Sequence, residues 1–261
     1  RFSFPWIVAP RQPESRTAVL ASNITWNAYN SFGGRSNYIH ADRLPGTPTV
    51  NSRMELPRYQ DPEHGTWGYA GYEPLSFERP EPFCAVEFEE RICDPIEGRQ
   101  ACHLAPAEWR LLGWLERENF AFDYYAENQL HDGTLDLSAY QVLVIAVHPE
   151  YWTRAMYDRV KRWVFEEGGR LMYLGGNGLN CEVTLHDNDS MTVHNGSIES
   201  LWAAGMGGRD SRFAMRHESE ASLLGVVFTP SGAMTGAPYE VLDADHWIFA
   251  DTGLRSGDLF G

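Results

Sequence analysis

The sequence has 261 residues, of which 43% are hydrophobic, so it can bury the core of one large domain with or without a subdomain. Its formal net charge of −15 argues against a surface for nucleic acid or for an anionic membrane. No apolar run approaches the length of a membrane-spanning helix, and we expect a cytoplasmic protein. Aromatic residues make up 13%, a content that suits an apolar pocket or an interface and favours an oligomer.

The first part of the chain predicts a linker, a strand and a long irregular region. Residues 1–16 contain three prolines and predict an extended linker, whereas residues 17–23 are apolar and β-branched and predict a buried strand. The aromatic segment 25–43 follows, and its Asn, Ser and Gly residues predict a loop. Its rings serve either as packing anchors or through the chemistry of their phenols. Residues 41–83 predict an irregular excursion with short strands.

The middle of the chain has a regular pattern. Residues 106–118 predict a helix, residues 120–125 a strand, and the continuous apolar run 139–147 a strand buried on both faces. Residues 153–169 predict an amphipathic helix, and residues 170–176 the next strand. A strand, a helix and a strand joined by short connections indicate a parallel sheet.

The last part of the chain contains shorter strand-like pieces, "EVTLHD", "SMTVH" and "SLLGVVFT", and shows no closing element. We therefore treat residues 17–261 as a single α/β domain, a three-layer sandwich with a mostly parallel sheet and loop-rich excursions. The missing closing element leaves open a continuation of the domain beyond Gly261. The sequence begins at Arg1, and we expect it to be a piece of a longer chain.

The cysteines carry little functional signal. There are four, and their spacing does not match a zinc site. The even spacing of Cys84, Cys93 and Cys102 would permit one disulfide in an oxidising compartment. Free structural thiols are favoured, because a chain of this size does not need disulfides for stability.

Polar and aromatic side chains follow three of the predicted strands. Tyr29 and Tyr38 follow the first strand, His148 and Glu150 the second, and Gly175-Gly176-Asn177 the third. Ligands of open parallel sheets bind at the carboxyl ends of the strands, so we expect these loops to converge on one edge.

Each of these groups also has a purely structural interpretation. Glu150 precedes a predicted helix and would complement the helix dipole. The Gly-Gly-Asn sequence would serve as a tight turn, and the tyrosines would be packed rings with hydroxyls in water. The sequence alone leaves both interpretations open.

Motifs of covalent hydrolases are absent from the sequence. There is no Gly-x-Ser-x-Gly or Gly-x-Cys-x-Gly element for a nucleophile, and no HExxH zinc motif. A hydrolase on this chain would therefore use a metal-activated water. Phenolate and carboxylate oxygens are hard donors that suit an ion such as Fe3+.

Four pieces of the sequence occur in a characteristic order: "TWNAYNSFGGRSNY", "SFERP", "VIAVHPEYW" and "GGRLMYLGGNG". Together they resemble the C-terminal domain of the N,N-dimethylformamidase β-subunit family. The resemblance implies a glutamine-amidotransferase-like (flavodoxin-like) sandwich without the catalytic cysteine. It also implies hydrolysis of a small amide at a mononuclear Fe3+ site.

The resemblance assigns roles to particular residues. His148 and Asn177 would be catalytic groups beside the metal, and Tyr38 is the alternative to either tyrosine ligand. A small subunit and an N-terminal domain, both outside this chain, are implied as partners. The implied ligands of the iron are Tyr29, Tyr69 and Glu150.

Three functions compete. The first is an iron-dependent hydrolase that cleaves the C–N bond of an amide like N,N-dimethylformamide. The second is a non-catalytic binding or scaffold domain on the same fold, and the third is a hydrolase that uses zinc or no metal. Convergence of Tyr29, Tyr69 and Glu150 in space would favour an enzyme.

Overall fold

The computed structural model describes residues 4–30, 32–37, 74–81, 103–187, 189–194, 213–227 and 238–260. Tyr38 and Tyr69 lie outside these residues, as does most of the predicted excursion. Residues 4–16 contain no helix or strand. None of the helices in the described part of the chain is long and apolar enough to span a membrane.

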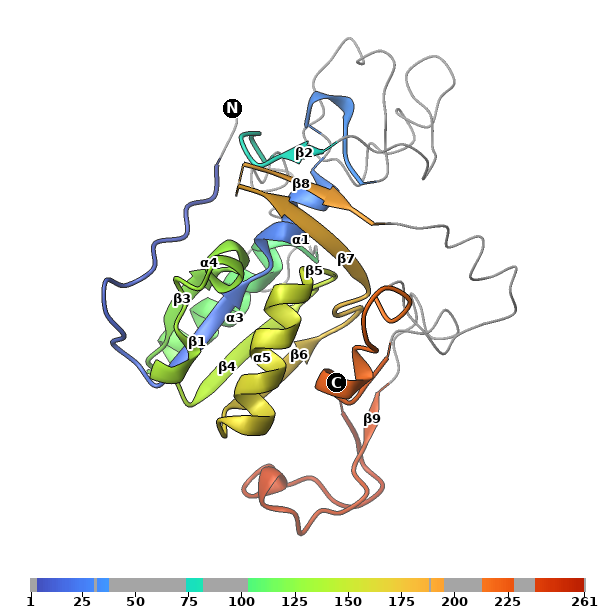
Figure 1. Cartoon of the computed structure of the whole chain (residues 1–261). Coiled ribbons are helices and arrows are strands. Elements are labelled where there is room, and N and C mark those ends of the chain that lie inside the picture. The colour runs from blue at the N-terminus through green and yellow to red at the C-terminus, as the bar shows by residue number, and fades with distance from the viewer. Residues whose placement is uncertain are drawn as a thin grey trace, which may run out of the picture.

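A four-stranded parallel sheet lies at the centre of the described residues (Figure 1). Its spatial order is β3-β1-β4-β6, and every neighbouring pair is parallel. Numbered along the chain, these strands lie in the order 2-1-3-4. The predicted parallel sheet is therefore confirmed. The strands are β1 (Thr17–Ala21), β3 (Asp123–Ala126), β4 (Val142–Val147) and β6 (Arg170–Gly175).

Helices cover both faces of this sheet. Alternate side chains of β1 point to opposite faces, so Leu20 packs with Met156 and Val160 of α5, whereas Val19 packs with Leu115 of α3. The helices α1 and α4 lie on the same face as α5. The four helices are α1 (Asn23–Tyr29), α3 (Ala105–Arg117), α4 (Glu127–Asp132) and α5 (Arg154–Glu166).

The segment that follows β1 differs from the expectation. Its first part, expected to be a loop, forms the helix α1. Two carboxylates from other helices accept hydrogen bonds from backbone amides at the start of α1. Glu127 accepts from the N–H of Ile24 at 2.9 Å, and Glu108 accepts from that of Ser22 at 3.3 Å. Local sequence did not predict this helix because the groups that satisfy its first amides come from distant parts of the chain.

A second, smaller sheet has the order β2-β8-β7-β5. The pieces "EVTLHD" and "SMTVH" form β7 and β8, as predicted. The prediction of a strand at "SLLGVVFT" is wrong, because its first residues lie in the short helix α7 (Ala221–Leu224), which ends at Gly225 with φ of 73°. The strands are β2 (Leu75–Ser76), β5 (Tyr151–Trp152), β7 (Cys181–His186) and β8 (Ser190–Val193).

The last described segment contains a short strand pair. β9 (Tyr239–Glu240) pairs antiparallel with β10 (Leu259–Phe260), and the pair extends away from the central sheet (Figure 1). Three short 3-10 turns complete the described elements: η1 (Phe32–Gly34), η4 (Leu137–Ala139) and η6 (Trp247–Phe249). The thiol of Cys181 is fully buried, and the other three cysteines lie outside the described residues.

Candidate functional site

The end of α1 and two loops meet at the carboxyl edge of the parallel sheet. The hydroxyl of Tyr29, at the end of α1, donates a hydrogen bond to Oε2 of Glu150 at 2.8 Å. Nε2 of His148 lies 3.4 Å from the same carboxylate oxygen. Asn177, after β6, donates from Nδ2 to Nε2 of His148 at 3.1 Å. The predicted convergence of the loops after β1, β4 and β6 is therefore confirmed.

Glu150 is 2% exposed, and its backbone is held in place by Thr25 of α1. Oγ1 of Thr25 accepts hydrogen bonds from the N–H groups of Glu150 at 3.0 Å and Tyr151 at 3.3 Å. The cap of α5 is a different residue, Thr153, whose side chain accepts from the N–H of Met156. Glu150 is therefore not the N-cap of α5, and its carboxylate contacts Tyr29 and His148.

The loop that carries Glu150 is also held from β7. The N–H of Leu179 donates to the carbonyl of Pro149 at 2.8 Å, and the N–H of Cys181 donates to the carbonyl of Glu150 at 3.1 Å. This part of the loop is therefore bound on one side by α1 and on the other by the start of β7.

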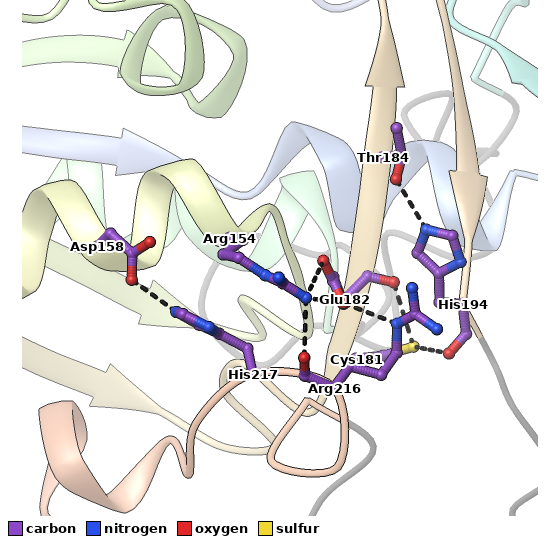
Figure 2. A network of polar contacts seen from close by, with 8 residues as sticks. All are labelled: Arg154, Asp158, Cys181, Glu182, Thr184, His194, Arg216 and His217. Carbon is purple, nitrogen blue, oxygen red and sulfur yellow. Dashed lines mark hydrogen bonds and ion pairs between the residues drawn. The ribbon is translucent and has the colours of Figure 1, made fainter.

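A polar network fixes β7 in turn (Figure 2). Glu182, which is 6% exposed, lies 3.2 Å from Nη2 of Arg154 and accepts from Nε of Arg216 at 2.7 Å. Arg154 also donates to the carbonyl of Arg216 at 2.8 Å. Oγ1 of Thr184 on β7 lies 2.8 Å from Nε2 of His194, the residue directly after β8. The network ties the start of α5 to the strand behind the candidate site.

The turn after β6 does more than reverse the chain. A Cβ atom at Gly175 would lie 2.9 Å from the carbonyl oxygen of Val147, so the ends of β4 and β6 approach each other where only glycine fits. Asn177 has φ of 54°, a left-handed conformation that Asn tolerates. Its Oδ1 is buried, and no donor in the described part of the chain reaches it. The turn therefore presents a buried amide beside His148.

His103 is a member of the site that the sequence did not predict. Its ring centroid lies 4.7 Å from that of Tyr29 and 4.7 Å from that of His148, with edge-on geometry in both cases. The residue lies two positions before the start of α3, which covers the other face of the sheet. The rule that ligands bind after the carboxyl ends of parallel strands could not find His103, because no strand is predicted directly before it. Its only local signal is a position just before a predicted helix.

The described residues bring together Tyr29, His148, Glu150 and Asn177 from the predicted set. The fifth member, Tyr69, lies outside the described residues, as does Tyr38, the alternative to either tyrosine.

The donor chemistry of the site is that of hard oxygen ligands. The phenol oxygen of Tyr29 and a carboxylate oxygen of Glu150 are 2.8 Å apart, and both atoms suit a hard, highly charged cation. In the described ranges, no group of three or more His, Cys, Asp and Glu side chains is arranged to hold a metal ion.

A family model described as "N,N-dimethylformamidase beta subunit-like, C-terminal" matches residues 1–261. The chain belongs to this family. The resemblance carried by the four sequence pieces is thereby confirmed. Within this N,N-dimethylformamidase beta subunit-like domain, those pieces contain Tyr29, His148, Glu150 and Asn177.

Two curated relatives share part of this domain. The N,N-dimethylformamidase beta subunit of Paracoccus aminophilus is 37% identical over 82 residues, and that of Alcaligenes sp is 38% identical over 82 residues. Each match covers 31% of this chain and 11% of the relative. Each match between this N,N-dimethylformamidase-like chain and a relative therefore spans only a small part of the length of the relative.

Proposed function

We propose that this chain is the catalytic domain of an amidohydrolase that cleaves the C–N bond of a small amide such as N,N-dimethylformamide. The observation that carries the proposal is the hydrogen bond from the Tyr29 hydroxyl to the buried carboxylate of Glu150. Nε2 of His148 lies 3.4 Å from the same carboxylate oxygen. Membership of the family and the names of the two relatives support the substrate class.

The proposed cofactor is a mononuclear Fe3+ ion, held by Tyr29, Glu150 and Tyr69, with Tyr38 as the alternative tyrosine. The chemical nature of the Tyr29 and Glu150 oxygens supports this choice. When bound, the ion supplies Lewis acidity, which polarises an amide carbonyl and lowers the pKa of a water molecule. Without the ion, the Tyr29 hydroxyl donates its proton in the hydrogen bond to Glu150. Binding of Tyr29 to the metal as a phenolate would release this proton.

The proposed roles of His148 and Asn177 are to orient the reactants. Asn177 fixes the His148 ring through the contact at Nε2. Its buried Oδ1 meets no donor within the described residues, and it would accept a hydrogen bond from the attacking water. Burial of Glu150 keeps bulk water from its carboxylate.

The proposed fold is a glutamine-amidotransferase-like sandwich without a catalytic cysteine. The strand order 2-1-3-4 agrees with the first four positions of the flavodoxin-like order, and helices cover both faces. Cys181, the one cysteine among the described residues, is fully buried at the start of β7. We also propose a small subunit, an additional N-terminal domain and an oligomeric assembly as partners, in keeping with the relatives being named subunits.

The test is release of formate and dimethylamine from N,N-dimethylformamide by the natural-length, iron-loaded protein. Glu150→Gln removes the charge of the proposed ligand and is expected to abolish the reaction. The matched control is Glu118→Gln. Glu118 is exposed and forms a long ion pair with Arg117, at 3.7 Å, so this variant is expected to keep the wild-type rate. Wild-type activity in Glu150→Gln, or no amide hydrolysis by the wild type, would contradict the proposal.

A further inference from the structure

Arg79, in the "SFERP" piece of the sequence, lies beside the end of α1 and has no role in the proposed reaction. Its five N–H groups make six hydrogen-bond contacts, so two of the three acceptors of Nη1 share one N–H. One goes to the carbonyl of Ser76 at 2.9 Å, close to Arg79 in the sequence. The other five reach the segment 27–35, more than forty residues earlier in the chain.

These five acceptors lie on both sides of Tyr29. Before it, Nη2 donates to the carbonyl of Asn27 at 3.0 Å and to its Oδ1 at 2.7 Å. After it, Nη1 donates to the carbonyl oxygens of Asn30 at 2.9 Å, Phe32 at 3.4 Å and Arg35 at 2.7 Å. A single planar group therefore fixes the backbone that enters and leaves Tyr29.

The end of α1 needs such a partner. The last carbonyl groups of a helix have no partner within it, and a cation near them is also favoured by the helix dipole. The C-cap Asn30 has extended backbone angles, so the chain leaves the helix abruptly directly after Tyr29. Arg79 and the N–H of Asn37, which donates to the carbonyl of Ala28 at 2.7 Å, satisfy these groups.

Arginine suits this position better than lysine. Its planar fork offers five N–H donors in fixed directions, whereas lysine offers three on one atom. Burial lowers the pKa of Arg79 to about 10, and the nearby Glu81 opposes this shift, so the group remains charged at neutral pH. Hydrogen bonds to a charged group are the stronger kind in proteins.

We infer that Arg79 is a positioning residue for the candidate site, which acts through Tyr29 by holding its phenol against Glu150. Without the hydrogen bonds from Arg79, the backbone before and after Tyr29 would lose this anchor. The Tyr29 hydroxyl would then not be held 2.8 Å from the carboxylate. The effect on the chemistry rests on the proposed function, whereas the effect on the position of Tyr29 does not.

The test uses 19F NMR of the natural-length protein labelled with 3-fluorotyrosine. The Tyr29 signal is assigned from its loss in Tyr29→Phe. In Arg79→Lys and Arg79→Gln, this signal is expected to shift or broaden, while that of Tyr157, whose hydroxyl donates to Ser219, stays unchanged. The matched control is Arg117→Lys, because Arg117 is 67% exposed, and it should leave the Tyr29 signal unchanged.

A second readout separates positioning of the site from general stability. Arg79→Lys is expected to lower kcat for amide hydrolysis about 10–100-fold, with a smaller change in KM and with its thermal midpoint near that of the wild type. An unchanged Tyr29 signal in a folded Arg79→Lys protein would overturn the inference. Unfolding of both Arg79 variants would also overturn it, because Arg79 would then hold the whole domain together.

Failure of the proposed function has a different signature. A wild-type protein that binds no iron and hydrolyses no amide contradicts the proposed reaction. The 19F signal of Tyr29 still decides whether Arg79 positions the phenol, because that measurement requires neither metal nor substrate.

Discussion

At the scale of single residues, Thr25 connects the helix that carries Tyr29 to the loop that carries Glu150. Its hydroxyl oxygen accepts from two buried backbone N–H groups, those of Glu150 and Tyr151. Four residues later in α1, Tyr29 donates to the carboxylate of Glu150. The helix therefore holds Glu150 through its backbone and through its side chain.

The first prediction concerns Thr25→Val, which keeps the shape of the side chain and removes the acceptor. The N–H groups of Glu150 and Tyr151 would lose this acceptor, although that of Glu150 also donates to the carbonyl of His148 at 2.9 Å, so the loss costs about 0.5–1.5 kcal/mol. We expect the free energy of unfolding in urea to fall by that amount. Thr134→Val, at an exposed position, is the control and should change little. Equal stability of the two variants would contradict the role given to Thr25.

The residues of the site show what a sequence can and cannot predict. Tyr29, His148 and Asn177 could be predicted together because each follows the carboxyl end of a parallel strand, and such ends share an edge. His103 could not, because it reaches the site from the start of α3. The role of Arg79 was also missed, because its acceptors are carbonyl groups, whose positions depend on the folded backbone.

At the scale of elements, α1 depends on two buried carboxyl groups from other helices. Glu108 of α3 accepts from the indole N–H of Trp26 at 3.0 Å, although the two residues are 82 positions apart. Burial raises the pKa of Glu127 well above its ordinary value. Burial also raises the pKa of Glu108 to about 8, although donors including Trp26 and Ser22 oppose the shift. These distant partners explain why a segment rich in Asn and Ser forms a helix.

The second prediction concerns the pH dependence of stability. Because the folded state raises the pKa of Glu108 from its ordinary 4.5 to about 8, it binds the proton more tightly than the unfolded state. The stabilising contribution is present in full below about pH 4.5 and is lost as the pH rises towards about 8. Glu108→Gln cannot titrate. We therefore expect the unfolding free energy of the wild type, minus that of the variant, to fall across this range.

Urea unfolding of both proteins at a series of pH values measures this difference. Glu116→Gln, on the same helix, is the matched control for loss of one negative charge. A difference between wild type and Glu108→Gln that does not change with pH would show that Glu108 keeps an ordinary pKa.

The third prediction concerns the network that fixes β7 (Figure 2). Glu182→Gln leaves the guanidinium groups of Arg154 and Arg216 without their shared counter-charge. Both groups are about half exposed, so water compensates part of the loss, and we expect a destabilisation of about 1–2 kcal/mol. Thermal unfolding measures it.

The control for this network is Glu167→Gln. Glu167 pairs with Arg162 at 3.6 Å, and both side chains are exposed, so the change should be within about 0.5 kcal/mol. If Glu182→Gln is as stable as this control, the network does not anchor β7.

At the scale of the whole molecule, the parallel sheet sets the position of the site. The continuous apolar run that became β4 and the amphipathic pattern of α5 were sufficient to predict the sheet, since both signals are local and strong. The smaller sheet was harder to predict, because β2 and β5 have only two residues each and are defined by their partners. The local pattern at "SLLGVVFT" resembled a strand, but Gly225 ends a short helix there.

The central claim is that Tyr29 and Glu150 bind iron together, and the most direct measurement is metal analysis with a visible absorption spectrum. We predict about one iron per chain and a phenolate-to-iron band. In Tyr29→Phe the band should be lost or shifted, whereas Tyr157→Phe, which alters a buried tyrosine on α5, should retain it. A colourless wild-type protein that cannot be loaded with iron, or a Tyr29→Phe protein with an unchanged band, would contradict the account.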